Sequence, residues 1–375
     1  MRVLLDVSAV PPRPVGAGVY TISIARGLAA HPEVELLLLA RHDDAGRWAT
    51  IAPGAGVHAL APSRRPARLV WEQTSGPGIA RRLRPDVWHA PHYTMPLRTT
   101  VPTVVAMHDL TFFDHPEWHE RSKVVYFRRM MAAAARRADA IITGSHDAAG
   151  RLRARLHPRA EVDVIHHGVD HDRFTAVADE GQDRAALARH GISSPYIAFA
   201  STIEPRKDVP TLVRAFARIA SDHPDVQLVV AGGEGWGIAE ARAAIASSGV
   251  ATRVLRPGYL PDATLAALFR RAAAIAYPSL AEGFGMPALE AMASGAPLVT
   301  TSGSSLDEIV GDAALLVPPA DVGALAGALA RLLDDDALAT RLRTAGPARA
   351  ATFTWERSVD AHLDVYRRTV GAAVA

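Results

Sequence analysis

The chain has 375 residues, with 41 basic and 39 acidic side chains and a formal net charge of only +2 at pH 7. This length suits two domains of ~100–200 residues each, and so small a net charge gives no argument for a nucleic-acid partner. Because the sequence contains no cysteine, disulfide bonds, thiolate catalysis and cysteine-bound zinc are excluded. No run of eighteen apolar residues occurs, and Asp6 interrupts the first apolar run too early for a signal peptide. We therefore expect a cytoplasmic protein.

Strands and helices are predicted to alternate through the first half of the chain. Short apolar runs typical of buried strands are Val3–Val7, Leu36–Ala40, Val87–His89, Thr103–Met107, Ala140–Thr143 and Val162–Ile165. Helical stretches lie between several of them, at Thr21–Ala30, Pro77–Leu83, Ser122–Ala138 and His146–Leu156. Such alternation predicts a doubly wound parallel sheet, and we assign residues 1–170 to this first domain.

A second alternating series follows a polar stretch, residues 171–195, which we predict to be a linker. Its strands are predicted at Tyr196–Ala200, Val226–Ala231, Val254–Pro257, Ala273–Tyr277 and Ala296–Thr301. Its helices are predicted at Val209–Ser221, Gly237–Ser248, Asp262–Arg271 and Met286–Ser294. Residues 196–353 form the second predicted domain, and residues 354–375 an amphipathic helix. The predicted fold class is α/β, with two Rossmann-like, doubly wound domains facing across a deep cleft.

Two glutamates flank a glycine loop and the start of a helix. Glu282 lies in the loop after the strand ending at Tyr277, and Glu290 lies about one turn inside the helix. Gly283 and Gly285 allow a tight turn and close approach of a ligand. Free N–H groups and the helix dipole attract anions to such a helix start. The arrangement predicts a site for a ligand that carries both phosphate and hydroxyl groups.

An arginine–lysine pair follows another predicted strand. Arg206 and Lys207 lie between the strand ending at Ala200 and the next helix, and the chain has only one other lysine, Lys123. An arginine binds phosphate through two parallel hydrogen bonds, and a lysine acts as a compact point charge. The pair is therefore predicted to bind a diphosphate.

The segment from Glu282 to Glu290, with Gly-Phe-Gly-Met-Pro-Ala-Leu between them, resembles the motif of retaining nucleotide-sugar glycosyltransferases of family 4, whose fold is GT-B. The resemblance implies that Glu290 holds the ribose hydroxyls of the donor and that Glu282 lies beside the donor sugar. It implies catalytic roles for His108, Arg206, Lys207 and Glu282. The implied donor-binding residues are Gly16, Gly18, Arg206, Lys207, Gly258, Tyr259, Leu260, Glu282, Gly283, Phe284, Gly285, Met286 and Glu290.

The resemblance also assigns parts of the chain to the acceptor and to the joint between domains. Residues 1–170 would form the acceptor-side domain, with Tyr20, Trp71 and Asp109 near the acceptor. The helix 354–375 would cross back to this domain. His167 stands where the family usually has asparagine before the glycine of its inter-domain segment, so only a hinge position is carried over there.

The implied reaction transfers a hexose to an acceptor hydroxyl with retained anomeric configuration, without a metal or a cofactor. Motifs such as Trp71-Glu-Gln73 are most similar to those of bacterial mannosyltransferases that use GDP-mannose, and donors such as UDP-glucose or UDP-N-acetylglucosamine are alternatives. The acceptor would be a glycan, a lipid-linked sugar or a small molecule. A sugar-nucleotide epimerase or a phosphorylase is a further alternative. A NAD-dependent oxidoreductase is more distant, because the first strand–helix turn lacks Gly-x-Gly-x-x-Gly.

The segment Arg121–Met131 interleaves basic residues with aromatic and apolar ones. Such a segment could lie on an anionic membrane surface, or it could pack its apolar side inward. Peripheral contact with the cytoplasmic face of a membrane is therefore an additional expectation.

Overall fold

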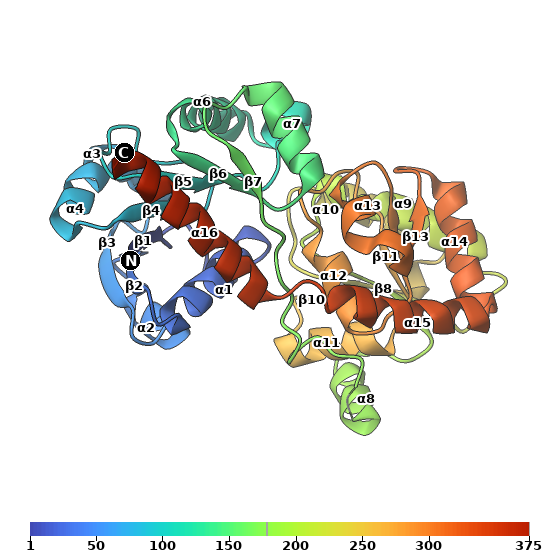
Figure 1. Cartoon of the computed structure of the whole chain (residues 1–375). Coiled ribbons are helices and arrows are strands. Elements are labelled where there is room, and N and C mark those ends of the chain that lie inside the picture. Colours follow the sequence, from blue (N-terminus) through green and yellow to red (C-terminus); the bar gives the residue numbers. More distant parts are fainter. Residues whose placement is uncertain (178, 375) are drawn as a thin grey trace. The chain divides into compact units, whose positions relative to one another are not determined.

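The computed structural model describes residues 1–177 and 179–374, which form two compact units (Figure 1). Unit 1 consists of Met1–Gly168 together with the helix that begins at Trp355, and unit 2 consists of Val169–Thr354. Each unit has its own parallel sheet with helices on its two faces, which confirms the predicted class of two Rossmann-like, doubly wound domains.

The described residues of unit 1 contain a parallel sheet of seven strands in the order β3-β2-β1-β4-β5-β6-β7. Its strands are β1 (Arg2–Asp6), β2 (Glu35–Arg41), β3 (Gly56–Ala61), β4 (Val87–Ala90), β5 (Thr103–Ala106), β6 (Ala140–Thr143) and β7 (Val162–Val164). The direction in which successive strands are added reverses between β1 and β4. In open α/β sheets, ligands bind outside the carboxyl ends of the strands at such a reversal.

Helices cover both faces of the unit 1 sheet. They are α1 (Ala17–Ala30), α2 (Ala45–Ile51), α3 (Arg65–Thr74), α4 (Gly76–Leu83), α5 (Thr111–Asp114), α6 (Arg121–Arg137), α7 (His146–Leu156) and α16 (Trp355–Val374), with a 3-10 turn η1 (Pro116–Trp118). Alternate residues of β1 point to opposite faces: Val3 and Leu5 join one apolar cluster and Leu4 the other. No described helix in either unit is long and apolar enough to cross a membrane.

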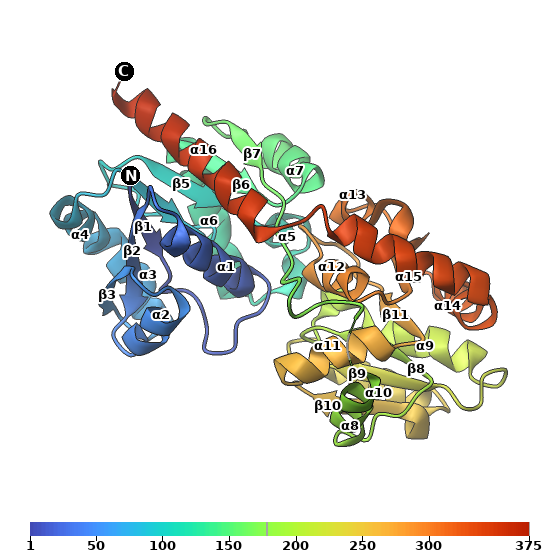
Figure 2. The same ribbon diagram turned by 60° about the horizontal axis from the view of Figure 1, so that its bottom comes forward.

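The C-terminal helix α16 is part of the unit 1 core. It lies beside α1 in both views (Figures 1 and 2). Its residues Val359, Leu363 and Tyr366 are buried in the same apolar cluster as Val3 and Leu5. One face of the first sheet is therefore covered by a helix from the far end of the chain.

The described residues of unit 2 contain a parallel sheet of six strands in the order β10-β9-β8-β11-β12-β13. Its strands are β8 (Tyr196–Ala200), β9 (Gln227–Ala231), β10 (Val254–Gly258), β11 (Ala274–Tyr277), β12 (Leu298–Thr301) and β13 (Leu315–Val317). Its helices are α8 (Glu180–Ala188), α9 (Val209–Ile219), α10 (Ile238–Ser247), α11 (Asp262–Arg271), α12 (Met286–Ala293), α13 (Ser305–Val310), α14 (Val322–Asp334) and α15 (Asp336–Ala350), with 3-10 turns η2 (Pro205–Lys207), η3 (Ala251–Arg253) and η4 (Gly311–Ala313). The direction in which successive strands are added to this sheet reverses between β8 and β11.

The predicted linker, residues 171–195, differs from the structure. Apart from residue 178, which lies outside the described residues, it belongs to unit 2 and contains the helix α8. Asp183 on α8 accepts two hydrogen bonds from Arg270 on α11, at 2.9 and 3.1 Å, and this ion pair is almost completely buried. The buried pair fixes α8 to unit 2, so this polar stretch is a packed element.

Candidate functional site

The loops after β8 and β11 bring three predicted residues together in unit 2. β8 and β11 are neighbours, so their carboxyl ends meet at the same edge of the sheet, where the strand order reverses. The Arg206 guanidinium contacts Glu282 Oε2 at 2.7 Å, and the Lys207 ammonium contacts Glu282 Oε1. The structure thus places the arginine–lysine pair against the first glutamate of the motif.

Two hydroxyl groups complete the surroundings of Glu282. The Tyr277 hydroxyl at the end of β11 donates to Glu282 Oε1 at 2.8 Å, and the Ser279 hydroxyl donates to the same oxygen at 2.5 Å. Lys207 also donates to the Tyr277 oxygen. The Glu282 carboxylate is therefore held by two cations and two hydroxyls, which fix both the loop and the orientation of the carboxylate.

The charges of this cluster shift the pKa values of its members. Burial alone would raise the pKa of Glu282, but Arg206 and Lys207 together with the hydrogen bonds lower it to about 2. Burial and the neighbouring Arg206 lower the pKa of Lys207 to about 8, against the opposing attraction of Glu282. At neutral pH both groups are ionised, and Arg206 also pairs with Glu204 at 3.0 Å.

Glycines support the loop that carries Arg206. A Cβ atom on Gly232 would overlap the backbone oxygen of Ser201, and one on Gly235 would lie 2.7 Å from the backbone oxygen of Ile203. The glycine-rich segment after β9 therefore packs its bare backbone against the segment 201–205. These glycines explain how the chain places the basic pair at the sheet edge.

The start of helix α12 is built on Gly285. Its φ of 99° lies in the left-handed region, and a Cβ there would lie 2.5 Å from the Leu306 side chain, so only glycine fits. The backbone oxygen of Glu282 accepts a hydrogen bond from the Ser305 hydroxyl at 3.0 Å. These contacts hold the Gly283–Gly285 loop at the N-terminus of α12, where backbone N–H groups attract anions.

Glu290 lies on α12, inside unit 2. Burial raises the pKa of its carboxyl to about 7, while Arg173 lowers it. Within the described residues its carboxylate makes no hydrogen bond or ion pair, although Arg173 itself pairs with Asp262 at 3.0 Å. The residue itself is only partly buried, and an acid with a strongly shifted pKa is a candidate site residue.

The remaining predicted donor residues of unit 2 divide by exposure. Leu260, Phe284 and Met286 are buried, and Phe284 packs edge-on against Phe353 with ring centres 6.1 Å apart. Tyr259 is about half exposed, next to Gly258 at the end of β10. Three of these residues therefore shape the loops through packing, and Tyr259 presents its ring to the surface.

In unit 1, Tyr20, predicted to lie near the acceptor, is a buried residue. Its side chain is 0% exposed, and its hydroxyl lies 2.7 Å from His362 Nε2 and 3.3 Å from His89 Nε2. The Tyr366 hydroxyl lies 2.6 Å from His89 Nδ1, and His362 Nδ1 lies 2.6 Å from the Ser358 oxygen. Tyr20 is thus an internal core residue whose hydroxyl is already used.

The hydrogen bonds around Tyr20 have one consistent direction. His362 donates from Nδ1 to a carbonyl, so its Nε2 accepts from Tyr20; the Tyr20 oxygen accepts from His89, and His89 Nδ1 accepts from Tyr366. Burial lowers the pKa of both histidines, that of His362 to about 4. The network is therefore neutral and joins α16 to α1 and β4.

His108 lies beside this network at the end of the β5 segment. Its Nε2 donates to the Pro91 oxygen at 2.8 Å, and its ring stacks edge-on against Tyr20 with centres 4.9 Å apart. Burial lowers the pKa of His108, so the ring is neutral with Nδ1 as the acceptor nitrogen. It can accept a hydrogen bond from a substrate hydroxyl.

The other predicted residues of unit 1 have local roles that the structure defines. Asp109 caps α5 by accepting from the Thr111 amide and hydroxyl at 3.1 and 2.8 Å. Trp71 on α3 packs against the apolar cluster beneath it. Gly16 caps α1 with φ 45° and has open space where a side chain would be, whereas Gly18 packs against Pro14. Gly16 is the more accessible of the two glycines.

The basic segment on α6 packs its apolar side inward. Val124, Phe127 and Met131 are buried in a core cluster. Arg128 donates to the backbone oxygens of Phe112 and Phe113 at 2.7 and 3.0 Å. The interleaved pattern is thus accounted for by packing within unit 1.

Tyr277 and Ser279 are the site residues that the sequence reasoning missed. They lie five and three residues before Glu282, and both donate a hydrogen bond to its carboxylate. A hydroxyl-bearing residue at and just after the end of a strand was the available signal. Among the described residues, no group of three or more histidine, aspartate or glutamate side chains is arranged to hold a metal ion.

Comparison with known proteins agrees with this geometry. The family described as "Glycosyltransferase Family 4" matches residues 14–173, and that described as "Glycosyl transferases group 1" matches residues 185–349. The chain is 31% identical to the D-inositol 3-phosphate glycosyltransferase of Salinispora arenicola, over 95% of this chain and 88% of that protein. It is 29% identical to the O-antigen chain mannosyltransferase B of Escherichia coli, over 80% and 77%.

A solved structure shares the fold. The sucrose-phosphate synthase of Thermosynechococcus elongatus superposes with a TM-score of 0.81 at 22% identity, over 99% of both chains. At this identity the similarity concerns the fold alone, which is GT-B. Taken with the two family matches and the relative from Salinispora arenicola, it shows that the chain belongs to family 4 of the glycosyltransferases.

Proposed function

We propose that this glycosyltransferase transfers mannose from GDP-mannose to an acceptor hydroxyl with retention of configuration and without a metal ion. The observation that carries the proposal is the contact of Arg206 and Lys207 with Glu282 at the edge where β8 and β11 meet. The basic pair supplies positive charge for a departing diphosphate, and α12 supplies backbone N–H groups beside it.

The roles of the two glutamates follow from their surroundings. Glu282 is ionised and held by four donors, so it can orient a sugar hydroxyl without becoming protonated. Glu290 is partly buried and has a raised pKa, and its carboxylate suits the two hydroxyls of a ribose. His108, with an acceptor nitrogen, would bind a hydroxyl of the hexose. The named activity of the Escherichia coli relative supports mannose as the sugar.

Other donors and reactions are alternatives that the first experiment separates. UDP-glucose or UDP-N-acetylglucosamine would use the same basic pair with a different base contact. A sugar-nucleotide epimerase would release free nucleotide without an acceptor. The acceptor itself is a glycan, a lipid-linked sugar or a small molecule, reached from the cytoplasm and in peripheral contact with the membrane face if it is lipid-linked.

The test is thermal unfolding of the full chain with GDP, UDP, dTDP, ADP or NAD, each with and without EDTA. A ligand at a hundred times its dissociation constant adds about 2.7 kcal/mol of stability. Stabilisation by GDP alone, unaffected by EDTA, is the expected result, and the anomeric configuration of the product with GDP-mannose is then read by NMR. Stabilisation by UDP alone would show that the donor is a UDP-sugar in place of GDP-mannose. A response to NAD alone, or to none of the five, would overturn the proposal.

A further inference from the structure

The charges around the proposed diphosphate site in unit 2 are already balanced. Glu282 contacts both Arg206 and Lys207. Glu204 contacts Arg206 as well, at 3.0 Å from its Nε atom. Two cations therefore face two carboxylates, and their charges cancel. Because a diphosphate is itself strongly anionic, it gains little electrostatic attraction from a balanced cluster unless one of the two acids gives up its place.

The two acids differ in how firmly they are held. The side chain of Glu282 is 7% exposed and has four donors. The side chain of Glu204 is 39% exposed, and its carboxylate has one partner among the described residues, Arg206. An ion pair that is open to water contributes little to stability, because water competes for both charges. Glu204 is therefore the acid that can leave the cluster at low cost.

The backbone keeps Glu204 beside Arg206 while its side chain can move. Glu204 has an extended backbone, with φ −118° and ψ 156°, as expected for a residue before a proline. The 3-10 turn η2 starts at Pro205 and is closed by a hydrogen bond from the Lys207 amide to the Glu204 oxygen at 2.9 Å. A Cβ atom on Gly237 would lie 2.9 Å from the Glu204 carbonyl carbon, so bare backbone packs closely behind this turn.

Both acids use N–H groups of Arg206 that a phosphate would need. The guanidinium donates from Nε to Glu204 at 3.0 Å and from Nη1 to Glu282 at 2.7 Å. An arginine holds a phosphate most firmly through two parallel N–H···O bonds. Each hydrogen bond to an acid therefore competes with the hold on a diphosphate.

We propose that Glu204 is a displaceable counter-ion of the donor site. The diphosphate replaces Glu204 on Arg206, while Glu282 stays in place. When the nucleoside diphosphate product leaves, Glu204 pairs with Arg206 again. This inference rests on the proposed function, because it takes Arg206 to be the residue that holds the diphosphate.

The proposal gives Glu204 an effect opposite to that of a residue that only supports the loop. Changing a supporting side chain would weaken the binding of a diphosphate. Removing a competitor for Arg206 strengthens it, because Arg206 no longer has to exchange one anion for another. Most of the change should appear as slower dissociation, since the affinities of related complexes differ mainly in their dissociation rates.

The test is isothermal titration calorimetry of the full chain with GDP, UDP and inorganic pyrophosphate. Glu204→Gln keeps the shape of the side chain and removes its charge. We expect this variant to bind pyrophosphate, and the nucleotide that the wild type prefers, about fivefold or more tightly than the wild type does. Glu204→Ala should change both affinities in the same direction. Unchanged or weaker binding by the two variants overturns the proposal.

A nearby acid provides the matched control. Glu234 is 52% exposed and lies opposite Ile203 in an isolated bridge between neighbouring segments. Its carboxylate pairs with Arg242 and Arg256 at 2.7 and 2.8 Å. Glu234→Gln thus removes the same charge without changing the partners of the proposed diphosphate site. We expect its dissociation constants to stay within about twofold of the wild type, and tightening equal to that of the Glu204 variant would refute direct competition.

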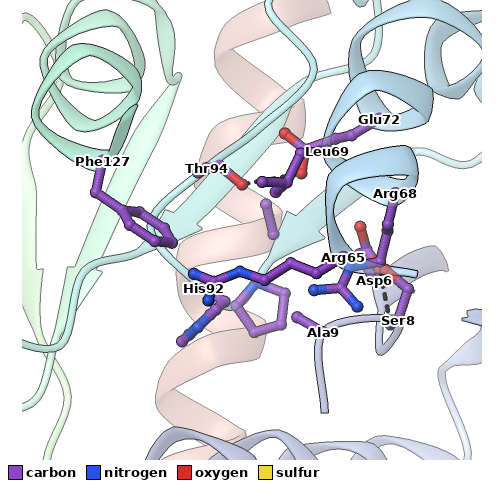
Figure 3. A pocket seen from close by; sticks show the side chains of 12 residues that line it. Asp6, Ser8, Ala9, Arg65, Arg68, Leu69, Glu72, His92, Thr94 and Phe127 are labelled. Carbon is purple, nitrogen blue, oxygen red and sulfur yellow. Dashed lines mark hydrogen bonds between the residues drawn. The ribbon is translucent and has the colours of Figure 1, made fainter. Parts of the chain in front are cut away.

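A double-mutant cycle confines the effect to Arg206. Arg65 and Arg68 line a cavity of about 220 Å³ in unit 1 (Figure 3), and these two cations could attract pyrophosphate independently. In Arg206→Gln the group that Glu204 competes for is missing. Adding Glu204→Gln to that variant should therefore change no dissociation constant by more than about twofold. Tightening that persists without Arg206 contradicts the proposal.

The choice of nucleotide separates this inference from the proposed function. Tighter binding of UDP in place of GDP by Glu204→Gln would support the displaceable counter-ion and refute GDP-mannose as the donor. Binding of GDP that is equal in the wild type and in Glu204→Gln would refute the counter-ion alone. Binding of none of the three ligands by either protein would refute both.

Discussion

Glu282 and Glu290 are eight residues apart, yet their environments give them opposite properties. Glu282 is surrounded by cations and hydroxyls, which lower its pKa to about 2. Desolvation raises the pKa of Glu290 to about 7, although Arg173 opposes this shift. One acid is therefore permanently charged, and the other changes charge near neutral pH. The motif thus combines a fixed anion with an adjustable one.

Lys207 should act on the rate of transfer. With GDP-mannose as donor, we expect Lys207→Ala to lower kcat by about 10²–10³, because a donor aimed at charge that develops in the transition state is lost. Steady-state kinetics at saturating donor measures this effect. Arg218→Ala, an exposed arginine on α9, is the control and should retain the wild-type kcat. A Lys207 variant with unchanged kcat would remove the basic pair from the mechanism.

Glu290 should act on donor binding. We expect Glu290→Gln to raise the KM for GDP-mannose by about tenfold or more, since hydrogen bonds to a charged group are worth about 1.5–3 kcal/mol. In the wild type the KM should also rise as the pH falls below about 7, because protonation removes the carboxylate charge. The variant should show no such dependence, and Glu240→Gln, an exposed acid on α10, should behave as wild type. A pH profile shared by wild type and Glu290→Gln would contradict this role.

At the scale of helices and strands, the sequence predicted the elements that have a strong apolar pattern. The apolar runs predicted as β1, β2, β8 and β11 are confirmed, because a strand of a parallel sheet is buried on both faces and reads as continuous apolar sequence. The edge strand β3 (Gly56–Ala61) was missed, because it contains histidine and small residues in place of such a run. Edge strands need less burial and leave a weaker pattern.

Contacts between distant residues explain the other misses. α8 has only one large apolar residue, Leu187, and the ion pair of Asp183 with Arg270, 87 residues along the chain, is a major part of its attachment. The hydrogen bond of Tyr20 with His362 joins residues 342 positions apart. Neither of these two contacts can be predicted from the residues that neighbour each partner in the sequence. The contact of Arg206 and Lys207 with Glu282 was implied only indirectly, through the rule that neighbouring strand ends meet.

The attachment of α8 can be tested by removing one partner. We expect Asp183→Ala to lower the free energy of unfolding of unit 2 by about 3–5 kcal/mol, because Arg270 would be left buried and unpaired. Glu180 on the same helix is 63% exposed and forms only surface ion pairs. We therefore expect Glu180→Ala to lower the free energy of unfolding by only about 0–1 kcal/mol. Urea denaturation of both variants gives the comparison. Equal, small losses would show that α8 is held by other contacts.

At the scale of the whole molecule, the two units should respond differently to acid. Among the described residues of unit 1, desolvation strongly affects five histidines and lowers their pKa values: His89, His92, His108, His167 and His362. In the unfolded chain each would take up a proton near pH 6.5, but in the folded chain only at lower pH. Acidification through 6.5 therefore favours the unfolded form of unit 1.

The acids with raised pKa values act in the opposite direction. Glu290 in unit 2 and Glu72 in unit 1 bind a proton near pH 7 when folded and near 4.3 when unfolded, so each stabilises its unit as the pH falls between these values. In unit 1 the five histidines outweigh Glu72. In unit 2, the described residues include Glu290 but no comparable set of histidines with lowered pKa values.

We therefore expect unit 1 to lose stability between pH 6.5 and 5, by up to about 1.4 kcal/mol per pH unit for each histidine that stays neutral, while unit 2 is unchanged or more stable. Hydrogen exchange resolved by peptide, corrected for the intrinsic effect of pH, measures both units in one sample. Tyr366→Phe, which removes the hydroxyl at His89 Nδ1, should lower the stability of unit 1 at pH 7.5 as well. Parallel loss in both units would show that the histidines do not set the acid response.

The position of α16 in the first core has a consequence for biosynthesis. The ribosome releases all of Val169–Thr354 before α16 emerges, so the part of the apolar cluster of Val3 and Leu5 that α16 completes stays uncovered while the whole of unit 2 is translated. Unit 2 is continuous along the chain and can fold as soon as it leaves the exit tunnel. The first half to be made is then the last to be completed, and its exposed apolar face is the part of the nascent chain that most needs protection by chaperones.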